Sequence, residues 1–403
     1  MRVAIVTETR ARVGGIETYL EQVIPALSAR HAVGFWAASA VSGDRGTIVL
    51  PGAVELLDHA GGPDALPRLR DFAPDVVFAH GLDDPDIESQ ALAVAPAVAV
   101  EHAYHGTCIS GSKTMQWPAV HACDRRFGPA CLALYFPRRC GGRNPLAMVR
   151  MYGVQSTRLA TLRRCAAVVT LSHHMRGEML QHGLDPNRVH VVPPFTGVTN
   201  ATGRSPRTPD GVVHLLFLGR LEPLKGVPRL IDALPLVSEA LSRVVQLTVA
   251  GDGADRFALE QQARLTEQRD SRVQVVFAGW LDANRRREVL AATDAMVVPS
   301  LWPEPFGLVG LEAAAAGVPA VAFATGGIPD WLKDGETGCL AEAEGARPQA
   351  LAGAIVRCVG DRRTLDRLSL NAEAFARGWT VDRHVGQLDA VLSAAAGESA
   401  APA

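Results

Sequence analysis

The stretch PSLWPEPFGLVGLEAAAAGVPAV, residues 299–321, places Glu304 and Glu312 in an otherwise apolar run, with seven residues between them. Charged side chains are seldom fully buried without partners. The pattern predicts a helix that starts near Gly307 and runs to Ala316, because a glycine and then a proline follow. Glu304 then lies in the loop before the helix, and Glu312 lies one and a half turns inside it.

This arrangement brings two kinds of polar group to one small volume. The backbone amides of Phe306, Gly307 and Leu308 point out of the predicted helix start without intrahelical partners. Carboxylates accept hydroxyl protons and amides donate to oxygens, which suits a polyhydroxylated, phosphorylated ligand. The alternative is that Glu304 only offsets the helix dipole while Glu312 pairs with a nearby arginine.

Working outward from this stretch, short apolar strands alternate with amphipathic segments along the whole chain, which is the pattern of parallel α/β layers. At 403 residues the length favours two domains. The strands expected in the first series cover residues 2–8, 32–38, 75–81, 97–103, 166–172 and 189–194. Those of the second series cover residues 213–220, 245–253, 273–280, 295–300, 319–327 and 337–342.

Residues 196–211 separate the two series and form the best linker candidate, since they are rich in Gly, Thr and Pro. We therefore predict two doubly wound domains, residues 1–195 and 212–377. Ligands of open α/β sheets bind at the carboxyl ends of the strands, so the site is expected in a cleft between the two sheets. A last helix, within residues 378–393, either caps the second domain or crosses back to the first.

The composition excludes several classes of protein. A hydrophobic content of 48%, a charged content of 20% and a net charge of −2 describe a soluble globular protein and not a general nucleic-acid binder. No apolar run approaches the roughly 18 residues that a spanning helix needs, and the N-terminus shows no secretory signal, so we expect a cytoplasmic location. Only three of the 40 basic residues are lysines: Lys113, Lys225 and Lys333.

Two basic residues follow the first strand of the second domain. In GRLEPLKG, residues 219–226, Arg220 and Lys225 are expected at the carboxyl end of that strand, where two cations would neutralise a diphosphate. The alternative is a solvated Arg-Glu-Lys turn. In the first domain His80 and His102 each follow a strand, and we expect a structural role for His80 and a functional one for His102.

Glycine-rich turns offer further anion sites, although a tight turn without a ligand is an equal alternative. Gly14 and Gly15 follow the first strand, and Gly326 and Gly327 follow a strand of the second domain. The turn AGDGADR, residues 250–256, lacks the third glycine of the dinucleotide fingerprint, which disfavours a nicotinamide cofactor. The acidic run DDPD, residues 83–86, more plausibly caps a helix than binds a metal.

Several segments in this order and spacing resemble the family-four retaining glycosyltransferases of the GT-B fold. GRLEPLKG, AGDG, VVFAGWL, VVPSLWPEPFGLVGLEAAAAGVPAVAFATGGIPD and DGETGCL are similar to the donor domain of that family. VGGIETYL, PDVVFAHG and VVPPF resemble its acceptor domain, and GWTVDRHVGQLDAVL resembles its final helix, which crosses back to the N-terminal domain. The resemblance implies two Rossmann-like domains that face each other across a cleft.

The resemblance also implies roles for individual residues. Glu304 and the amides of Phe306, Gly307 and Leu308 would hold the hydroxyls and distal phosphate of a nucleoside diphosphate sugar, and Glu312 would hold the ribose. Further donor-site and catalytic positions would be Gly15, Gly219, Arg220, Lys225 and His102, with Arg220 and Lys225 on the diphosphate and His102 near the transferred sugar. Because cations and helix-start amides stabilise the leaving group, no metal or other cofactor is expected for transfer.

Residues 101–153 depart from the family pattern. They contain Cys108, Cys123, Cys131 and Cys140, and clustered cysteines in a cytosolic chain suggest metal or redox chemistry. A structural zinc site, an iron–sulfur centre and unconnected thiols remain as alternatives. Residues 101–165 also hold ten Lys or Arg against two acidic residues, which fits a phosphorylated acceptor, a peripheral contact with an anionic membrane, or a solvated face.

The leading interpretation is an enzyme that moves a hexose-type unit from a nucleoside diphosphate sugar to an acceptor hydroxyl, on a polysaccharide, a lipid-linked molecule or a secondary metabolite. A nucleotide-sugar epimerase or a sugar-phosphate synthase of the same fold is a second enzyme hypothesis. A catalytically silent nucleotide-sugar binding subunit belongs to a different class, and a dinucleotide-dependent oxidoreductase is the most distant alternative.

Overall fold

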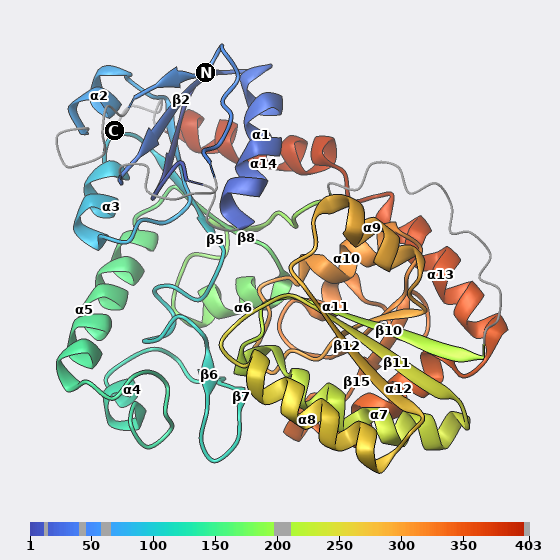
Figure 1. The fold of residues 1–403 in the computed structure, drawn as a ribbon. Helices are drawn as coiled ribbons and strands as arrows, with labels where there is room; N and C mark the ends of the chain where they lie inside the picture. The colour runs from blue at the N-terminus through green and yellow to red at the C-terminus, as the bar shows by residue number, and fades with distance from the viewer. Residues whose placement is uncertain (12–14, 40–45, 58–65, 197–210, 399–403) are drawn as a thin grey trace. The chain divides into compact units, whose positions relative to one another are not determined.

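The computed structural model describes residues 1–11, 15–39, 46–57, 66–196 and 211–398, and the chain folds into two compact units. The first unit consists of Met1–Lys113, Asp124–Pro194 and Thr380–Ala403, and the second consists of Thr114–Cys123 and Phe195–Trp379. Gly14 and most of the predicted linker 196–211 lie outside the described residues. Each unit is built on its own parallel sheet (Figure 1).

The sheet of the first unit has the strand order β3-β2-β1-β4-β5-β8-β9, in which the chain moves outward first in one direction and then in the other. This is the doubly wound arrangement, and every neighbouring pair is parallel. The strands are β1 (Arg2–Thr7), β2 (Ala32–Ala37), β3 (Glu55–Leu56), β4 (Val76–Ala79), β5 (Ala97–Glu101), β8 (Ala167–Thr170) and β9 (Val189–Val191). The helices are α1 (Gly15–Ser28), α2 (Leu66–Asp71), α3 (Pro85–Ala91), α4 (Ala130–Leu134), α5 (Pro145–Leu162), α6 (His173–Gln181) and α14 (Val381–Glu398).

The sheet of the second unit has the order β12-β11-β10-β13-β14-β15, again doubly wound and parallel. Its strands are β10 (Val212–Leu218), β11 (Val244–Ala250), β12 (Val273–Gly279), β13 (Ala295–Val298), β14 (Ala320–Phe323) and β15 (Gly338–Ala341). Its helices are η2 (Pro223–Lys225), α7 (Val227–Leu241), α8 (Arg256–Arg269), α9 (Ala283–Ala291), α10 (Leu308–Ala315), α11 (Ile328–Trp331), η3 (Glu344–Ala346), α12 (Pro348–Val359) and α13 (Arg362–Ala376).

The apolar runs form these strands because a parallel sheet covered on both faces buries every side chain. The central strands β4, β5, β13 and β14 are buried at each position. All twelve strands predicted from the sequence form, with bounds shifted by a few residues, and the predicted α/β fold class is confirmed. The sequence analysis missed β3 and the antiparallel pair β6 (Thr114–Met115) and β7 (His121–Ala122), which are only two residues long each.

The last helix, α14, belongs to the first unit, where it packs against α1, β4 and β5. Val385, Leu388 and Leu392, which share one face of this helix, are fully buried. A hydrogen bond between Asp389 and His31 (2.7 Å) adds a polar contact next to the start of β2. Within the part of the chain that the structure describes, no helix is both long and apolar enough to cross a membrane.

Candidate functional site

The centre of the second sheet places the GRLEPLKG turn beside the opening stretch, because β10 and β13 are neighbours in the sheet and both end at the same edge. Gly226 follows η2 with a φ of +70°, and a Cβ there would lie 1.9 Å from the carbonyl oxygen of Pro299. Only glycine permits this approach. The amide of Leu301 donates to the carbonyl of Leu224 (2.8 Å), and together these contacts hold Lys225 over the end of β13.

Lys225 and Glu304 form an ion pair at this edge, with 2.7 Å between Nζ and Oε1. Ser300 donates its hydroxyl to the same oxygen (2.5 Å), and the Lys225 ammonium lies 5.3 Å from the ring centre of Trp302. The Glu304 side chain is only 7% exposed and that of Lys225 is 21% exposed. No hydrogen bond among the described residues engages Oε2 of Glu304, so this oxygen is available to a ligand.

The glycine pair Gly326 and Gly327 fixes the backbone of Glu304. Gly326 has a φ of +59°, and a Cβ at this position would lie 2.3 Å from the carbonyl oxygen of Glu304. Gly327 donates its amide to that carbonyl (2.7 Å). This pair therefore serves as a turn that positions the carboxylate, and the amide of Gly327 is already engaged.

The helix predicted after Glu304 is confirmed as α10, which begins at Leu308 and is preceded by Gly307 with a φ of +93°. No hydrogen bond among the described residues takes up the amides of Phe306, Gly307 and Leu308. Trp331 is buried beneath this turn and donates its indole N–H to the carbonyl of Phe306 (2.6 Å). The start of α10 thus has unengaged backbone N–H donors close to Glu304 in the sequence, and the buried Trp331 holds this turn in place.

Glu312 lies inside α10 and pairs with Arg286 of α9, with 3.0 Å between Oε2 and Nη1. Burial raises the pKa of the Glu312 carboxyl above its ordinary value, and the Arg286 charge opposes that shift. The alternative weighed from the sequence, that Glu312 pairs with an arginine, is therefore what the structure contains. Its other oxygen, Oε1, has no hydrogen bond among the described residues.

Arg220 differs from Lys225 in its surroundings. It follows Gly219 at the end of β10, but its side chain is 69% exposed and pairs with Glu222 at 2.9 Å. For Arg220, the structure therefore matches the alternative of a solvated Arg-Glu-Lys turn. The two cations predicted together thus differ in burial, and only Lys225 is paired with Glu304.

In the first unit His102 follows β5 and His80 follows β4, at the same edge of the sheet, and 3.0 Å separates Nε2 of His102 from Nδ1 of His80. Burial lowers the pKa of His102 to about 4 and that of His80 well below its ordinary value. Tyr19 lies beside both histidines and His384 lies beside Tyr19, and neither residue was predicted from the sequence. Gly15 is exposed at the start of α1.

The acidic run 83–86 caps a helix, as expected. The side chain of Asp84 accepts hydrogen bonds from the amides of Asp86 and Ile87 at the start of α3. The capping oxygens are engaged by backbone donors, which is the ordinary arrangement at a helix N-terminus.

The four cysteines of the 101–153 segment do not assemble into a metal site. The described residues contain no group of three or more His, Cys, Asp or Glu side chains that could hold a metal ion. The sulfur of Cys108 accepts a hydrogen bond from the amide of Lys113 (3.3 Å), and that of Cys131 faces the carbonyl of Arg126 (3.9 Å). The structural zinc hypothesis and the iron–sulfur hypothesis therefore find no support in the structure.

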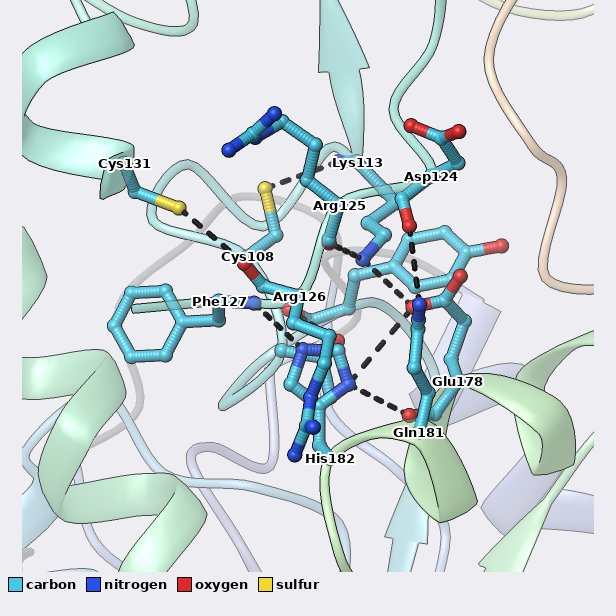
Figure 2. A network of polar contacts seen from close by, with 12 residues as sticks. Cys108, Lys113, Asp124, Arg125, Arg126, Phe127, Cys131, Glu178, Gln181 and His182 are labelled. Carbon is cyan, nitrogen blue, oxygen red and sulfur yellow. Dashed lines mark hydrogen bonds and ion pairs between the residues drawn. The ribbon is translucent and has the colours of Figure 1, made fainter. Parts of the chain in front are cut away.

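A buried polar network orders this segment instead. Figure 2 shows Lys113 pointing at Glu178 of α6, 2.7 Å from its Oε2, and Lys113 also donates to the carbonyl of Arg125 (2.6 Å). His182 accepts from the amide of Phe127 through Nε2 (2.8 Å), while Nδ1 lies 2.6 Å from the carbonyl of Glu178. The Lys113 side chain is 1% exposed, so one of the three lysines serves as an internal tie between the segment and α6.

Comparison with known proteins agrees with this architecture. Residues 13–198 match the family described as Glycosyltransferase Family 4, and residues 202–375 match Glycosyl transferases group 1. A D-inositol 3-phosphate glycosyltransferase from Geodermatophilus obscurus is 31% identical over 386 residues, which cover 87% of this chain and 82% of the relative. A glycogen synthase from Mycobacterium tuberculosis is 32% identical, covering 72% of this chain and 61% of that protein.

Among solved structures, the Anabaena protein HepE in complex with UDP and glucose superposes with a TM-score of 0.66 at 19% identity, covering 97% of this chain and 99% of HepE. At that identity the likeness shows the fold alone. The two family models together span nearly all of the chain, and the relative from Geodermatophilus covers most of it. The chain therefore belongs to family 4 of the glycosyltransferases and is a glycosyltransferase with a GT-B-type fold.

Proposed function

We propose that the protein transfers a sugar from a nucleoside diphosphate sugar to an acceptor hydroxyl, with retention of the anomeric configuration. The observation that carries the proposal is the group formed by Lys225, Glu304 and the start of α10 at one edge of the second sheet. A buried carboxylate with one open oxygen, a cation and unengaged amides lie together. They match the hydroxyls and the phosphates of such a donor.

Each donor part has a proposed partner. Oε2 of Glu304 accepts hydrogen bonds from hydroxyls of the sugar, since Oε1 already accepts hydrogen bonds from Lys225 and Ser300. The amides of Phe306, Gly307 and Leu308 bind the distal phosphate. Oε1 of Glu312 accepts hydrogen bonds from the ribose hydroxyls, while Arg286 donates a hydrogen bond to Oε2.

The reaction requires stabilisation of a diphosphate leaving group and of a sugar with oxocarbenium-like charge. Lys225, assisted by the exposed Arg220, balances the charge that develops on the leaving diphosphate. These groups are in place before the reaction, so the proposed transfer needs no metal. His102 is proposed to contact the transferred sugar, and Gly15 to allow close approach to the diphosphate. Retention is proposed to follow front-face attack by the acceptor hydroxyl within the ion pair.

The relatives suggest which ligands to test first. Solved structures with the same fold contain UDP, UDP with glucose, and UDP-glucose, so a uridine diphosphate sugar is the first donor to examine. The relative from Geodermatophilus is named for an inositol phosphate acceptor. A phosphorylated polyol is therefore the first acceptor, ahead of polysaccharide, lipid-linked and secondary-metabolite hydroxyls.

The decisive experiment is a thermal-shift screen of the purified chain with UDP, GDP, ADP and dTDP and their glucose conjugates. A ligand that binds only the folded state, at a hundredfold excess over Kd, adds about 2.7 kcal/mol to the free energy of unfolding. This added stability raises Tm. The best donor is then incubated with acceptors, and the product's anomeric configuration is read by NMR. The donor-site assignment fails if no nucleotide raises Tm, and the retaining mechanism fails if the product is inverted.

The same experiment separates the alternative functions. An epimerase would change the donor sugar without any acceptor, and a sugar-phosphate synthase would require a sugar phosphate as acceptor. A silent binding subunit would show a thermal shift and no turnover with any acceptor. Because all the proposed donor-site residues are present, we expect turnover.

A cytoplasmic location is part of the proposal, since a hydrophobic content of 48%, a charged content of 20% and a net charge of −2 describe a soluble globular protein. Peripheral contact with an anionic membrane is proposed for residues 125–150, which contain six arginines and no acidic residue. Leu146 and Val149 project from the first turns of α5 and are 81% and 59% exposed. Such a surface gains about 1 kcal/mol for each basic residue near anionic lipid. Co-sedimentation with vesicles that contain phosphatidylglycerol, compared with phosphatidylcholine alone, tests this contact.

A further inference from the structure

A cluster of four aromatic side chains, which we call the histidine cluster, joins distant parts of the first unit. Tyr19 lies on α1, His80 follows β4, His102 follows β5, and His384 lies on α14. The ring centre of Tyr19 is 5.6 Å from that of His80, 5.9 Å from that of His102 and 5.3 Å from that of His384. Four separate chain segments therefore converge on one group of titratable rings, and the proposed function uses only His102.

Two members of the cluster have their proton positions set by their partners. Nδ1 of His384 lies 2.7 Å from the carbonyl oxygen of Pro193, which can only accept, so Nδ1 carries the proton. Neutral His384 therefore accepts through Nε2 from the Tyr19 hydroxyl, at 2.7 Å. Burial lowers the pKa of His384 to about 4, which keeps this ring neutral near pH 7.

The contact between His80 and His102 allows two proton arrangements. In one, Nε2 of His102 donates to Nδ1 of His80, and neutral His80 must then carry its own proton on Nε2. That nitrogen is buried and has no hydrogen-bond partner among the described residues. A buried N–H without an acceptor costs about 1–3 kcal/mol, and orphaned N–H groups are rarer than orphaned acceptors.

The other arrangement leaves no fully buried donor of the two rings without an acceptor. Nδ1 of His80 donates to Nε2 of His102, and the buried group left without a partner is the lone pair on Nε2 of His80. Both rings stay neutral in this arrangement. His102 then carries its proton on Nδ1, which has no hydrogen bond among the described residues but is not fully buried, so a ligand can accept from it.

The geometry points to His80 as a positioning residue that fixes His102 in the Nδ1–H tautomer, so that His102 presents a neutral donor to the transferred sugar. The inference rests on the proposed role of His102 near the sugar. A neutral donor binds a sugar hydroxyl without repelling the positive charge that develops on the sugar ring, whereas an imidazolium would oppose it. His80 thus keeps the structural role expected from the sequence, and through the tautomer of His102 this role affects catalysis.

The tautomer is tested directly by NMR of protein labelled with ¹⁵N-histidine, because protonated and unprotonated ring nitrogens have well-separated ¹⁵N shifts. The chain contains 12 histidines, and spectra of His80→Leu and His102→Gln assign the two rings. We expect a protonated Nδ1 and an unprotonated Nε2 on His102, with the reverse or a mixture in His80→Leu. A wild-type His102 protonated on Nε2 overturns the inference, whatever the enzyme's activity.

Kinetics then connect the tautomer to turnover. His80→Leu is expected to lower kcat about tenfold, which corresponds to about 1.4 kcal/mol, with the donor KM changed by less than about twofold. His80→Asn keeps an N–H near the position of Nδ1 and is expected to restore most of kcat. The control is His31→Asn, which removes a histidine contact to Asp389 of α14 outside the cluster.

The outcomes separate this inference from the proposed function. If His102 has the expected tautomer but His102→Gln turns over as the wild type does, the tautomer stands and the role of His102 at the sugar fails. If His80→Leu and His80→Asn lose kcat equally at unchanged Tm, the donor role of His80 is refuted.

Discussion

Replacement of Lys225 by methionine tests the centre of the proposed donor site. The side chain keeps its apolar stem, but the ammonium that lies 2.7 Å from Oε1 of Glu304 is lost. Removal of one preorganised electrostatic group typically lowers kcat by 10² to 10³, or about 2.7 to 4 kcal/mol. We expect the lower end of that range for Lys225→Met, since Arg220 and the helix-start amides are also proposed to bind the diphosphate.

The same change should also affect Glu304, which would keep Ser300 as its donor but lose its cation. Because the Glu304 side chain is only 7% exposed, leaving its carboxylate without a cation is costly. Glu304→Gln should therefore cost less in the Lys225→Met background than in the wild type, so the two substitutions are expected to be coupled.

The assay is single-turnover transfer with a saturating donor, which separates the chemical step from product release. Lys333→Met is the matched control, because Lys333 is an exposed lysine of the same unit whose ammonium donates to the nearby carbonyl of Pro329. Equal rates for wild type, Lys225→Met and Lys333→Met would remove Lys225 from the diphosphate role. If the activation free-energy changes of Lys225→Met and Glu304→Gln simply add in the double variant, the two residues are not coupled.

Further predictions concern three other features of the chain. Glu312→Gln should raise the donor KM more than it lowers kcat, because the ribose is remote from the chemistry; an unchanged KM would contradict the ribose assignment. Lys113→Met removes the cation beside the buried Glu178 and should destabilise the first unit by about 3–5 kcal/mol in denaturant titration. Adding Glu178→Leu should recover part of that loss. If neither effect is seen, Lys113 does not act as an internal tie. The folded pKa values of His102 and His384, about 4, lie below the ordinary value of 6.5, so the unfolded chain binds more protons between these limits. The free energy of unfolding should therefore decrease as the pH falls from about 6.5 towards 4, by on the order of 2 kcal/mol per histidine at pH 5, and a Tm that stays flat over that window would show that the rings are not held neutral.

Much of the fold and part of the site could be predicted from local sequence. The apolar runs identified all twelve long strands, because a buried parallel strand needs a continuous apolar segment. Glycine after the run of alanines predicted the end of α10, and the order of the motifs predicted the family. The two-residue strands β3, β6 and β7 escaped prediction because two residues carry no periodicity.

The sequence by itself determined the strands, the helix that follows Glu304 and contains Glu312, and the residue types at the carboxyl ends of the strands. Only the tertiary structure decided which of them pair. Lys225 meets Glu304 across 79 positions because Gly226 lets η2 lie on the end of β13, and Arg220 does not share that contact. Likewise His384 joins the histidine cluster because α14 packs against α1, β4 and β5, and the buried Lys113 reaches Glu178 of α6 from a distant part of the sequence. Local propensities set each element, whereas these partnerships depend on how close two backbones come, which no local pattern encodes.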